Sequence, residues 1–212
     1  MKTYHIKDNV DFSIYPGGIG VCVSGGLDSA LLLYFTLKYA EEPIHIFSLA
    51  SQEKLLRNTH ASINVVNKCI ELTGNYNLTH HISYVSEQTK ENLFTLPFQF
   101  LNSNTISTIY TGITKNPPRH VTDSFTLPTL ENQERDPTVT RVVKQKSFYM
   151  PWTNIDKLDL HDIYEKYNLM DTLYPVTRSC EWVSYTNWPD PGDNHCGKCW
   201  WCQERVWGFG KL

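Results

Sequence analysis

The sequence of 212 residues lacks a long apolar run and a strong excess of either charge. Its longest apolar run, residues 30–35, is far shorter than the roughly 20 residues that span a bilayer. Residues 1–15 mix charged and apolar side chains without the apolar core of a signal peptide. The formal net charge of −3 excludes a strongly basic nucleic-acid-binding arm. These absences predict a cytoplasmic protein that makes no contact with a membrane.

The six cysteines are unevenly distributed. Cys22 and Cys69 lie inside apolar segments, where a free thiol usually packs as a small hydrophobic side chain. In a reducing compartment, clustered cysteines bind a metal more often than they form disulfides. The other four cysteines form such a cluster near the C-terminus: Cys180, Cys196, Cys199 and Cys202.

Apolar spacing and turn residues predict strands that alternate with helices. Alternation of this kind favours an α/β fold with a doubly wound parallel sheet, in which ligands bind outside the carboxyl ends of the strands. Residues 116–150, rich in proline, predict a long loop that orders over a substrate. The expected strands are residues 19–24, 44–50, 79–85 and 107–113, and the expected helices are residues 30–39, 58–72 and 158–169.

A glycine turn, residues 24–29 (SGGLDS), joins the first expected strand to the first expected helix. Adjacent glycines let the backbone approach a ligand closely, and amides at a helix N-terminus favour an anion. A carboxylate such as Asp28 is expected beside phosphate mainly where Mg²⁺ bridges the two groups. No Gly-Lys-Ser/Thr follows, so the turn is not a Walker A loop. The alternative is an ordinary tight turn in which Asp28 caps the helix.

The SGGLDS turn after a hydrophobic strand resembles the pyrophosphate loop (PP-loop) of the ATP pyrophosphatase superfamily. The resemblance implies an adenine nucleotide alpha hydrolase-like, Rossmann-like fold, and an enzyme that adenylates a carbonyl oxygen before a nucleophile displaces AMP. It places the ATP phosphates and Mg²⁺ at Ser24, Gly25, Gly26, Leu27, Asp28 and Ser29. It places the rest of the nucleotide beside Phe47, Ser48 and Gly112.

The cysteine cluster predicts a structural zinc site, because four thiolates at about 2.3 Å leave no ligand position open for water. His195, beside the cluster, is an alternative ligand or a supporting donor. An iron–sulfur cluster and reactive or disulfide-forming cysteines are the alternatives to zinc. The tryptophans of the same tail, such as Trp201, either stack on a heterocycle or supply hydrophobic packing.

Taken together, several motifs resemble the 7-cyano-7-deazaguanine synthase family. They are the SGGLDS turn, Asp156-Lys157 before a helix, Thr177-Arg-Ser-Cys180 and the terminal CGKCWWCQERVWGF. The resemblance implies a ligase that converts 7-carboxy-7-deazaguanine, ammonia and ATP to the nitrile, with Asp28 and Lys157 as catalytic residues. It also implies an ATP-binding domain over residues 1–178 and a zinc-binding lobe over residues 179–212.

Two departures from that family leave other functions open. Residues 48–54 lack the expected stretch after the second strand, and residues 188–192 lengthen the interval between Cys180 and Cys196. The alternatives are adenylation of another acid, of a tRNA base or of a protein terminus, and a nucleotide-binding module without turnover. Mild acidity argues against tight, nonspecific RNA binding, although docking through Arg141, Lys144 and Lys146 stays open, as does a homodimer.

Overall fold

A six-stranded, mostly parallel sheet forms the centre of the protein, seen here in a computed structural model that describes residues 1–51, 57–86, 90–125, 135–181 and 194–212. The strands lie in the order β5-β4-β3-β6-β8-β7, and only β7 runs antiparallel to its neighbour. The predicted α/β fold with a parallel sheet is confirmed. The strands are β3 (Ile19–Cys22), β4 (Ile44–Ser51), β5 (Leu78–Val85), β6 (Thr108–Tyr110), β7 (Lys144–Gln145) and β8 (Phe148–Tyr149).

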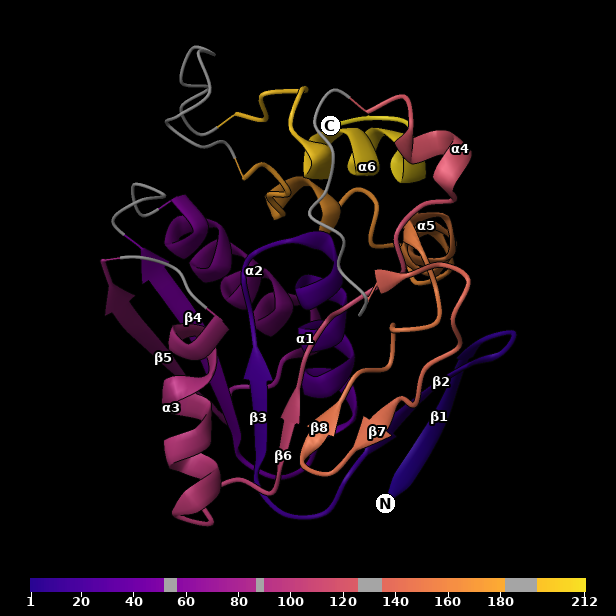
Figure 1. Ribbon diagram of the computed structural model, residues 1–212. Coiled ribbons are helices and arrows are strands. Elements are labelled where there is room, and N and C mark those ends of the chain that lie inside the picture. Colours follow the sequence, from indigo (N-terminus) through magenta and orange to yellow (C-terminus); the bar gives the residue numbers. More distant parts are fainter. Residues whose placement is uncertain (52–56, 87–89, 126–134, 182–193) are drawn as a thin grey trace.

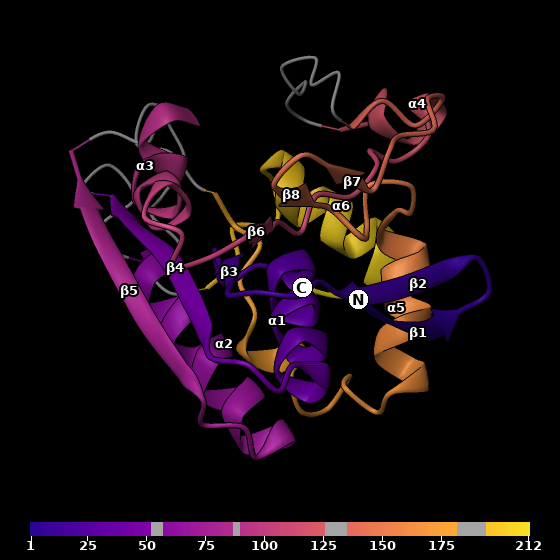
Figure 2. The same cartoon turned by 90° about the horizontal axis from the view of Figure 1, so that it is seen from below.

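Helices cover both faces of the sheet (Figures 1 and 2). Helices α1 (Leu27–Tyr39) and α2 (Arg57–Thr73) lie on one face, and α3 (Lys90–Asn102) lies on the other. Every residue of α1 from Ser29 to Leu37 is buried. A helix that is enclosed on all sides has no need of a polar face, which explains why residues 30–35 form the longest apolar run.

An N-terminal hairpin of β1 (Lys2–Lys7) and β2 (Val10–Ile14) extends the core beside the sheet. The sequence pattern did not predict this hairpin. Phe12 anchors it, because its ring lies 5.8 Å from that of Tyr149 and 5.7 Å from that of Trp152. The Ser13 amide donates to the Tyr149 hydroxyl at 2.7 Å, so the hairpin is also tied to β8 by a hydrogen bond.

Part of the proline-rich segment 116–150 is ordered structure. It contains α4 (Arg119–Thr122) and the β7–β8 hairpin, so the expectation of one long loop is wrong for these described residues. Residues 126–134 lie outside the described part of the chain. The predicted helix 158–169 is α5 (Lys157–Lys166), which ends before Asn168, whose φ of 56° is left-handed.

The C-terminal helix α6 (Trp200–Phe209) lies above the carboxyl ends of the strands (Figure 1) and packs against α5. A Cβ atom at Gly208 would come within 2.3 Å of the Lys157 Cβ, so only glycine allows the two helices to approach this closely. The short 3-10 helix η2 (Tyr174–Val176) leads into this segment. The Phe209 ring lies 5.4 Å from Tyr164 and 5.1 Å from Tyr174, which anchors α6 to the main core.

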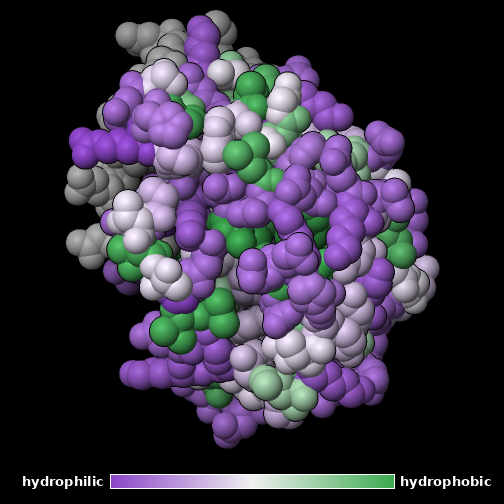
Figure 3. Space-filling view, turned by 90° about the vertical axis from the view of Figure 1, so that its right-hand side faces the viewer, coloured by the Kyte–Doolittle hydropathy of each residue, from purple (hydrophilic) through white to green (hydrophobic). Residues whose placement is uncertain are grey.

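The molecular surface is largely hydrophilic on the face shown in Figure 3, where apolar side chains form small separate groups. Within the described residues, no helix has both the length and the apolar character needed to cross a bilayer.

Candidate nucleotide site and thiol cluster

The turn between β3 and α1 has a geometry that suits an anion. Gly25 has a φ of 86°, and a Cβ there would lie 2.6 Å from the Ala61 Cβ, so the position requires glycine on both counts. The Ser24 amide and hydroxyl lie 3.3 and 3.2 Å from the Ser29 hydroxyl, which keeps the turn compact. Gly26 is the N-cap of α1, and no side chain caps the helix. The first amides of α1 therefore keep their donor capacity for a ligand.

The strand β6 brings Gly112 directly against this turn. A Cβ at Gly112 would lie 2.8 Å from the Asp28 carbonyl carbon and from the Ser29 amide nitrogen, so a larger residue would displace the start of α1. Two buried side chains support the same backbone from the other direction. The Trp152 indole donates to the Asp28 carbonyl at 3.2 Å, and the Tyr164 hydroxyl donates to the Leu27 carbonyl at 2.9 Å.

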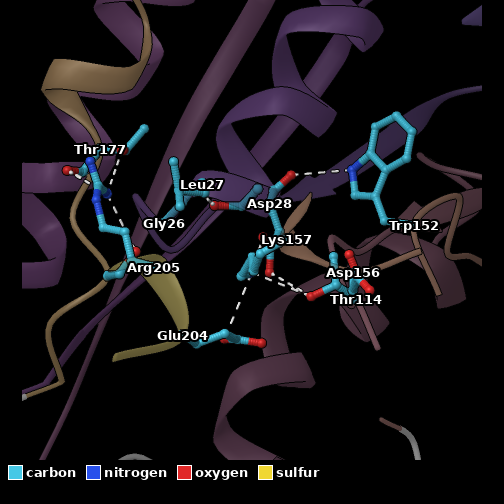
Figure 4. A network of polar contacts seen from close by, with 12 residues as sticks. Gly26, Leu27, Asp28, Thr114, Trp152, Asp156, Lys157, Thr177, Glu204 and Arg205 are labelled. Carbon is cyan, nitrogen blue, oxygen red and sulfur yellow. Dashed lines mark hydrogen bonds and ion pairs between the residues drawn. The ribbon is translucent and has the colours of Figure 1, made fainter. Parts of the chain in front are cut away.

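The two residues expected to be catalytic, Asp28 and Lys157, meet at the turn (Figure 4). The Lys157 ammonium forms an ion pair with Asp28 and lies 3.3 Å from the Thr114 hydroxyl, which in turn lies 3.4 Å from the Asp28 carboxylate. Lys157 is only 5% exposed. Asp28 therefore binds a buried cation rather than capping α1.

Lys157 takes its position from the start of α5. Asp156 caps this helix, because its carboxylate accepts from the amides of Leu158 and Asp159, and Asp159 completes a capping box. The capped first turn fixes Lys157 as the first helical residue, with its side chain directed at the glycine turn.

Two further charged residues complete the network, and the sequence analysis missed both as functional residues. Glu204, from α6, is 1% exposed; its carboxylate forms an ion pair with Arg135 and lies 4.0 Å from the Lys157 ammonium. Arg135 also donates to the Thr114 carbonyl at 2.9 Å. Glu204 lies inside the C-terminal CGKCWWCQERVWGF motif, which was the available signal, whereas Arg135 belongs to none of the motifs.

Two pockets meet at the glycine turn. Both are lined by Ser24, Gly26, Asp28, Gly112 and Ile113. One continues along an apolar wall and the other along a charged wall. The apolar wall includes Cys22, Phe47, Leu49, Leu93 and Phe94, and the charged wall includes Arg135, Lys157, Arg178, Glu181, Trp201 and Glu204.

The predicted residues occupy different places in these pockets. Leu27 lines the charged pocket, and Ser29 and Phe47 line the apolar one. Ser48 lines neither pocket, because its hydroxyl donates to the Val23 carbonyl at 2.7 Å and lies 2.8 Å from His80. Gly25 is buried behind the turn and shapes it without lining either cavity.

Thr111 is a polar residue of the apolar pocket that the sequence did not identify. It is 5% exposed, and its hydroxyl has no hydrogen-bond partner among the described residues. A buried hydroxyl without a partner is costly unless a ligand satisfies it. The signal in the sequence that could have identified Thr111 was its position directly before Gly112, at the end of β6.

The four clustered cysteines come together as predicted. Their sulfur atoms all lie within 4.8 Å of one another, and all four are free thiols. The amides of Cys196 and Cys199 donate to the sulfurs of Cys180 and Cys196 at 3.4 and 3.3 Å. A hydrogen bond with Cys180 and burial raise the pKa of Cys199 to about 12, so a cation is needed to hold Cys199 as a thiolate. The donor set therefore fits a metal such as zinc.

His195 lies beside the thiol cluster and outside it. Its Nε2 accepts a hydrogen bond from the Ser179 amide at 3.1 Å. Among the described residues, the group able to hold a metal contains the four cysteines and no histidine. Burial lowers the pKa of His195 to about 4, which keeps the ring neutral and suited to that structural hydrogen bond.

Comparisons with known proteins found one family match and similar solved structures. The asparagine synthase family matches residues 17–109, which contain the SGGLDS turn. The chain is similar to an NH3-dependent NAD synthetase from Campylobacter jejuni subsp. jejuni NCTC 11168 in complex with the nitrate ion, at 13% identity and a TM-score of 0.46, over 76% of this chain and 69% of that one. It is also similar to NMN synthetase from Francisella tularensis, at 12% identity and a TM-score of 0.48, over 93% and 79% of the two chains.

No curated protein matches the chain significantly. The asparagine synthase match covers less than half of the chain, but it includes the glycine turn and the central strands on both sides of it. This match supports the ATP pyrophosphatase superfamily. It does not extend to the narrower 7-cyano-7-deazaguanine synthase family.

Proposed function

We propose that this protein is an ATP-dependent carbon–nitrogen ligase that converts 7-carboxy-7-deazaguanine and ammonia to 7-cyano-7-deazaguanine. The observation that carries the proposal is the meeting of Asp28, Lys157 and the uncapped start of α1 at the junction of two pockets. The cysteine-rich C-terminal motif adds the family resemblance that selects this acid. A reducing cytoplasmic setting suits the free thiols, and a homodimer remains a prediction.

The two pockets suit the two parts of such a reaction. In this proposal the adenine occupies the apolar pocket beside Phe47, where the Thr111 hydroxyl gains a partner from the base. The phosphates lie at the glycine turn, and the acceptor acid lies in the charged pocket beside Trp201. The acid and the α-phosphate then meet at the residues that both pockets share.

The chemistry begins with a poor electrophile. A carboxylate oxygen attacks the α-phosphorus, the bond to the bridging oxygen of the β-phosphate breaks, and pyrophosphate leaves. Ammonia then adds to the carboxyl carbon, and AMP and a proton leave, which gives an amide. A second ATP then adenylates the amide oxygen, with release of pyrophosphate and one N–H proton. Departure of AMP, which carries that oxygen away, together with the remaining N–H proton forms the nitrile. The protein contributes mainly position and charge, which Lys157 and the α1 amides supply to the phosphates.

The proposal includes two metal ions, one at the glycine turn and one at the thiol cluster. Asp28, whose carboxylate lines both pockets, would hold Mg²⁺, which supplies charge neutralisation to the phosphates. Lys157 would then pass from Asp28 to the phosphate oxygens. The four cysteines would hold zinc in a closed, structural site.

The direct test follows the product by mass. The protein is incubated with ATP, Mg²⁺, isotope-labelled ammonium and 7-carboxy-7-deazaguanine, with the Asp28→Asn variant beside it and Asp8→Asn as a surface control. We expect labelled nitrile from the native protein and the control, and none from Asp28→Asn. ATP binding without labelled amide or nitrile would reject this acid as the substrate.

Adenylation of another acid, a tRNA base or a protein terminus remains the alternative. Measuring pyrophosphate release across a panel of carboxylic acids and tRNA would identify it. Docking of nucleic acid through Lys144 and Lys146 has no structural support so far, because the Lys144 ammonium binds the Lys146 carbonyl and lies 5.1 Å above the Tyr15 ring. A nucleotide-binding module without turnover would bind ATP and release no pyrophosphate with any acceptor.

A further inference from the structure

One short helix connects the thiol cluster to the charged residues of the nucleotide site. Cys199 is the N-cap of α6, Cys202 lies in its first turn, and Glu204 follows two residues later. Cys202 is fully buried and Glu204 is 1% exposed, so both side chains are fixed by their surroundings. Any shift of the first turn of α6 therefore moves the Glu204 carboxylate as well.

Glu204 acts on the site through Lys157. Its carboxylate lies between Arg135 and Lys157. Lys157 reaches the Asp28 carboxylate on its other side (Figure 4). The four groups carry two positive and two negative charges in a mostly buried space. Loss of one carboxylate leaves a buried cation without compensation, which is unfavourable in a medium of low dielectric constant.

Arg135 extends this connection to β6. It donates to the carbonyls of Thr114 and Lys115 at 2.9 and 3.3 Å, just beyond Gly112, which contacts the glycine turn. Glu204 thus holds two cationic side chains in place. Lys157 faces the glycine turn directly, and Arg135 holds the chain that follows β6 beside that turn. The contacts of Glu204 with Lys157 and with Arg135 both start from α6, the helix that also carries Cys199 and Cys202.

We propose that metal loading at the four thiols and nucleotide binding at the glycine turn are thermodynamically coupled, with Glu204 as the positioning residue that links them. This inference rests on the proposed function, because it takes the turn as the nucleotide site. The metal fixes the first turn of α6, and Glu204 then holds Lys157 and Arg135 where the phosphates need them. Since coupling between two binding sites is reciprocal, a bound nucleotide must retain the metal to the same degree.

The test measures metal release rather than catalysis. Metal-loaded protein is mixed with a colour-forming chelator, with and without Mg²⁺ and an ATP analogue whose α–β bridge is a methylene group. Nucleotide binding is measured separately by calorimetry. The variants are Glu204→Gln, the double variant Glu204→Gln/Arg135→Gln, and Glu165→Gln as a control, because Glu165 is an exposed glutamate of α5 outside this network.

The native protein and Glu165→Gln should release metal at least about fivefold more slowly when the analogue is bound, a factor in the usual range for coupled sites. Glu204→Gln should bind the metal stoichiometrically but show less than a twofold effect of the analogue. The double variant keeps the buried charges balanced and so tests the same point if the single variant folds poorly.

If the nucleotide slows metal release equally in the native protein and in either Glu204 variant, the link through Glu204 is overturned. Nucleotide binding detected by calorimetry would still support the nucleotide site in that case. Nucleotide binding with no slowing of metal release in the native protein would overturn it as well. If calorimetry detects no nucleotide binding to the native protein, the proposed function fails and the inference fails with it.

Discussion

Asp28 and Lys157 form a pair in which each residue depends on the other. Lys157 is 5% exposed and has its ion pair with Asp28 at the glycine turn. Sequence alone suggests that replacing Asp28 impairs the reaction and leaves folding nearly unchanged. The structure changes the second half of that expectation, because the substitution removes the partner of a buried cation.

We therefore predict that Asp28→Asn abolishes turnover and also lowers the free energy of unfolding by about 3 kcal/mol, near the lower limit for breaking a buried ion pair. The expected loss of stability is near this lower limit because the Glu204 carboxylate, 4.0 Å from the Lys157 ammonium, still compensates part of its charge. Chemical denaturation measures the stability, and pyrophosphate release measures the activity. Asp8→Asn should leave both unchanged, since the Asp8 side chain is 99% exposed. Native stability in Asp28→Asn would contradict this prediction.

Gly112 gives a second prediction for a single residue. In Gly112→Ala the new Cβ would lie 2.8 Å from the backbone of Asp28 and Ser29, so the turn must shift. We expect a destabilisation of about 1–3 kcal/mol, typical of overpacking, together with weaker ATP binding. Calorimetric titration with ATP and thermal unfolding measure the two effects. Native ATP binding and native stability in Gly112→Ala would contradict this prediction.

Residues whose chemistry follows from a local motif were predictable, and residues placed by tertiary contacts were not. Asp28 lies inside the SGGLDS turn, and Lys157 follows a capping aspartate. Glu204 and Arg135 are separated by 69 residues and meet only because α6 packs on α5 above the sheet. No spacing rule in the sequence connects two such positions.

At the scale of elements, the apolar periodicity of the sequence predicted bounds close to the observed ones for the strands and helices of the first half of the sheet. The expected strand 44–50 is β4 (Ile44–Ser51), and the expected helix 58–72 is α2 (Arg57–Thr73), ended by Gly74 with a φ of 67°. The strand β6 (Thr108–Tyr110) is shorter than expected, because the chain after it turns along the site. Helix α3 escaped prediction because it contains Pro97, which normally argues against a helix.

Three histidines on adjacent strands make stability depend on pH. His45 Nδ1 lies 3.1 Å from His81 Nε2, and His80 binds Ser48. Burial lowers the pKa of all three, and the neighbouring histidine lowers it further for His80 and His81. The folded state therefore binds fewer protons than the unfolded state when the pH falls below about 6.5.

We predict that stability is full above pH 6.5 and decreases as the pH falls through the lowered pKa values of these histidines. Urea unfolding at pH 7.5, 6.0 and 5.0, values chosen around that reference point, measures the slope. The double variant His45→Gln/His81→Gln should reduce this slope, whereas His60→Gln, at an exposed position on α2, should not. The remaining slope comes from His80 and His195, whose pKa values are also lowered by burial. A native slope that persists in the double variant would assign the pH dependence to other groups.

At the scale of the whole molecule, a metal held by the four thiols would stabilise more than its own segment. We predict that Cys202→Ser loses the metal and about 3 kcal/mol of stability, which corresponds to a drop in Tm of roughly 6–12 °C. The reason is that α6, which begins at the thiols, anchors Phe209 against the main core. Elemental analysis and thermal unfolding measure the two losses.

Cys69→Ala is the control for that experiment, because Cys69 is a buried thiol of α2 outside the cluster. It should keep about one metal ion per chain, as a closed four-thiolate site requires. A Cys202→Ser protein with native metal content and native Tm would show that the cluster does not bind a structural ion.

The nucleotide site draws its groups from widely separated parts of the chain: Asp28 follows the first strand of the sheet, Thr114 follows β6, and Lys157 and Glu204 come from the last two helices. During synthesis, the glycine turn therefore emerges long before the side chains that complete it. No fragment that stops short of Glu204 contains all four groups. The complete charge network of the proposed site therefore forms only after the C-terminal helix has been synthesised.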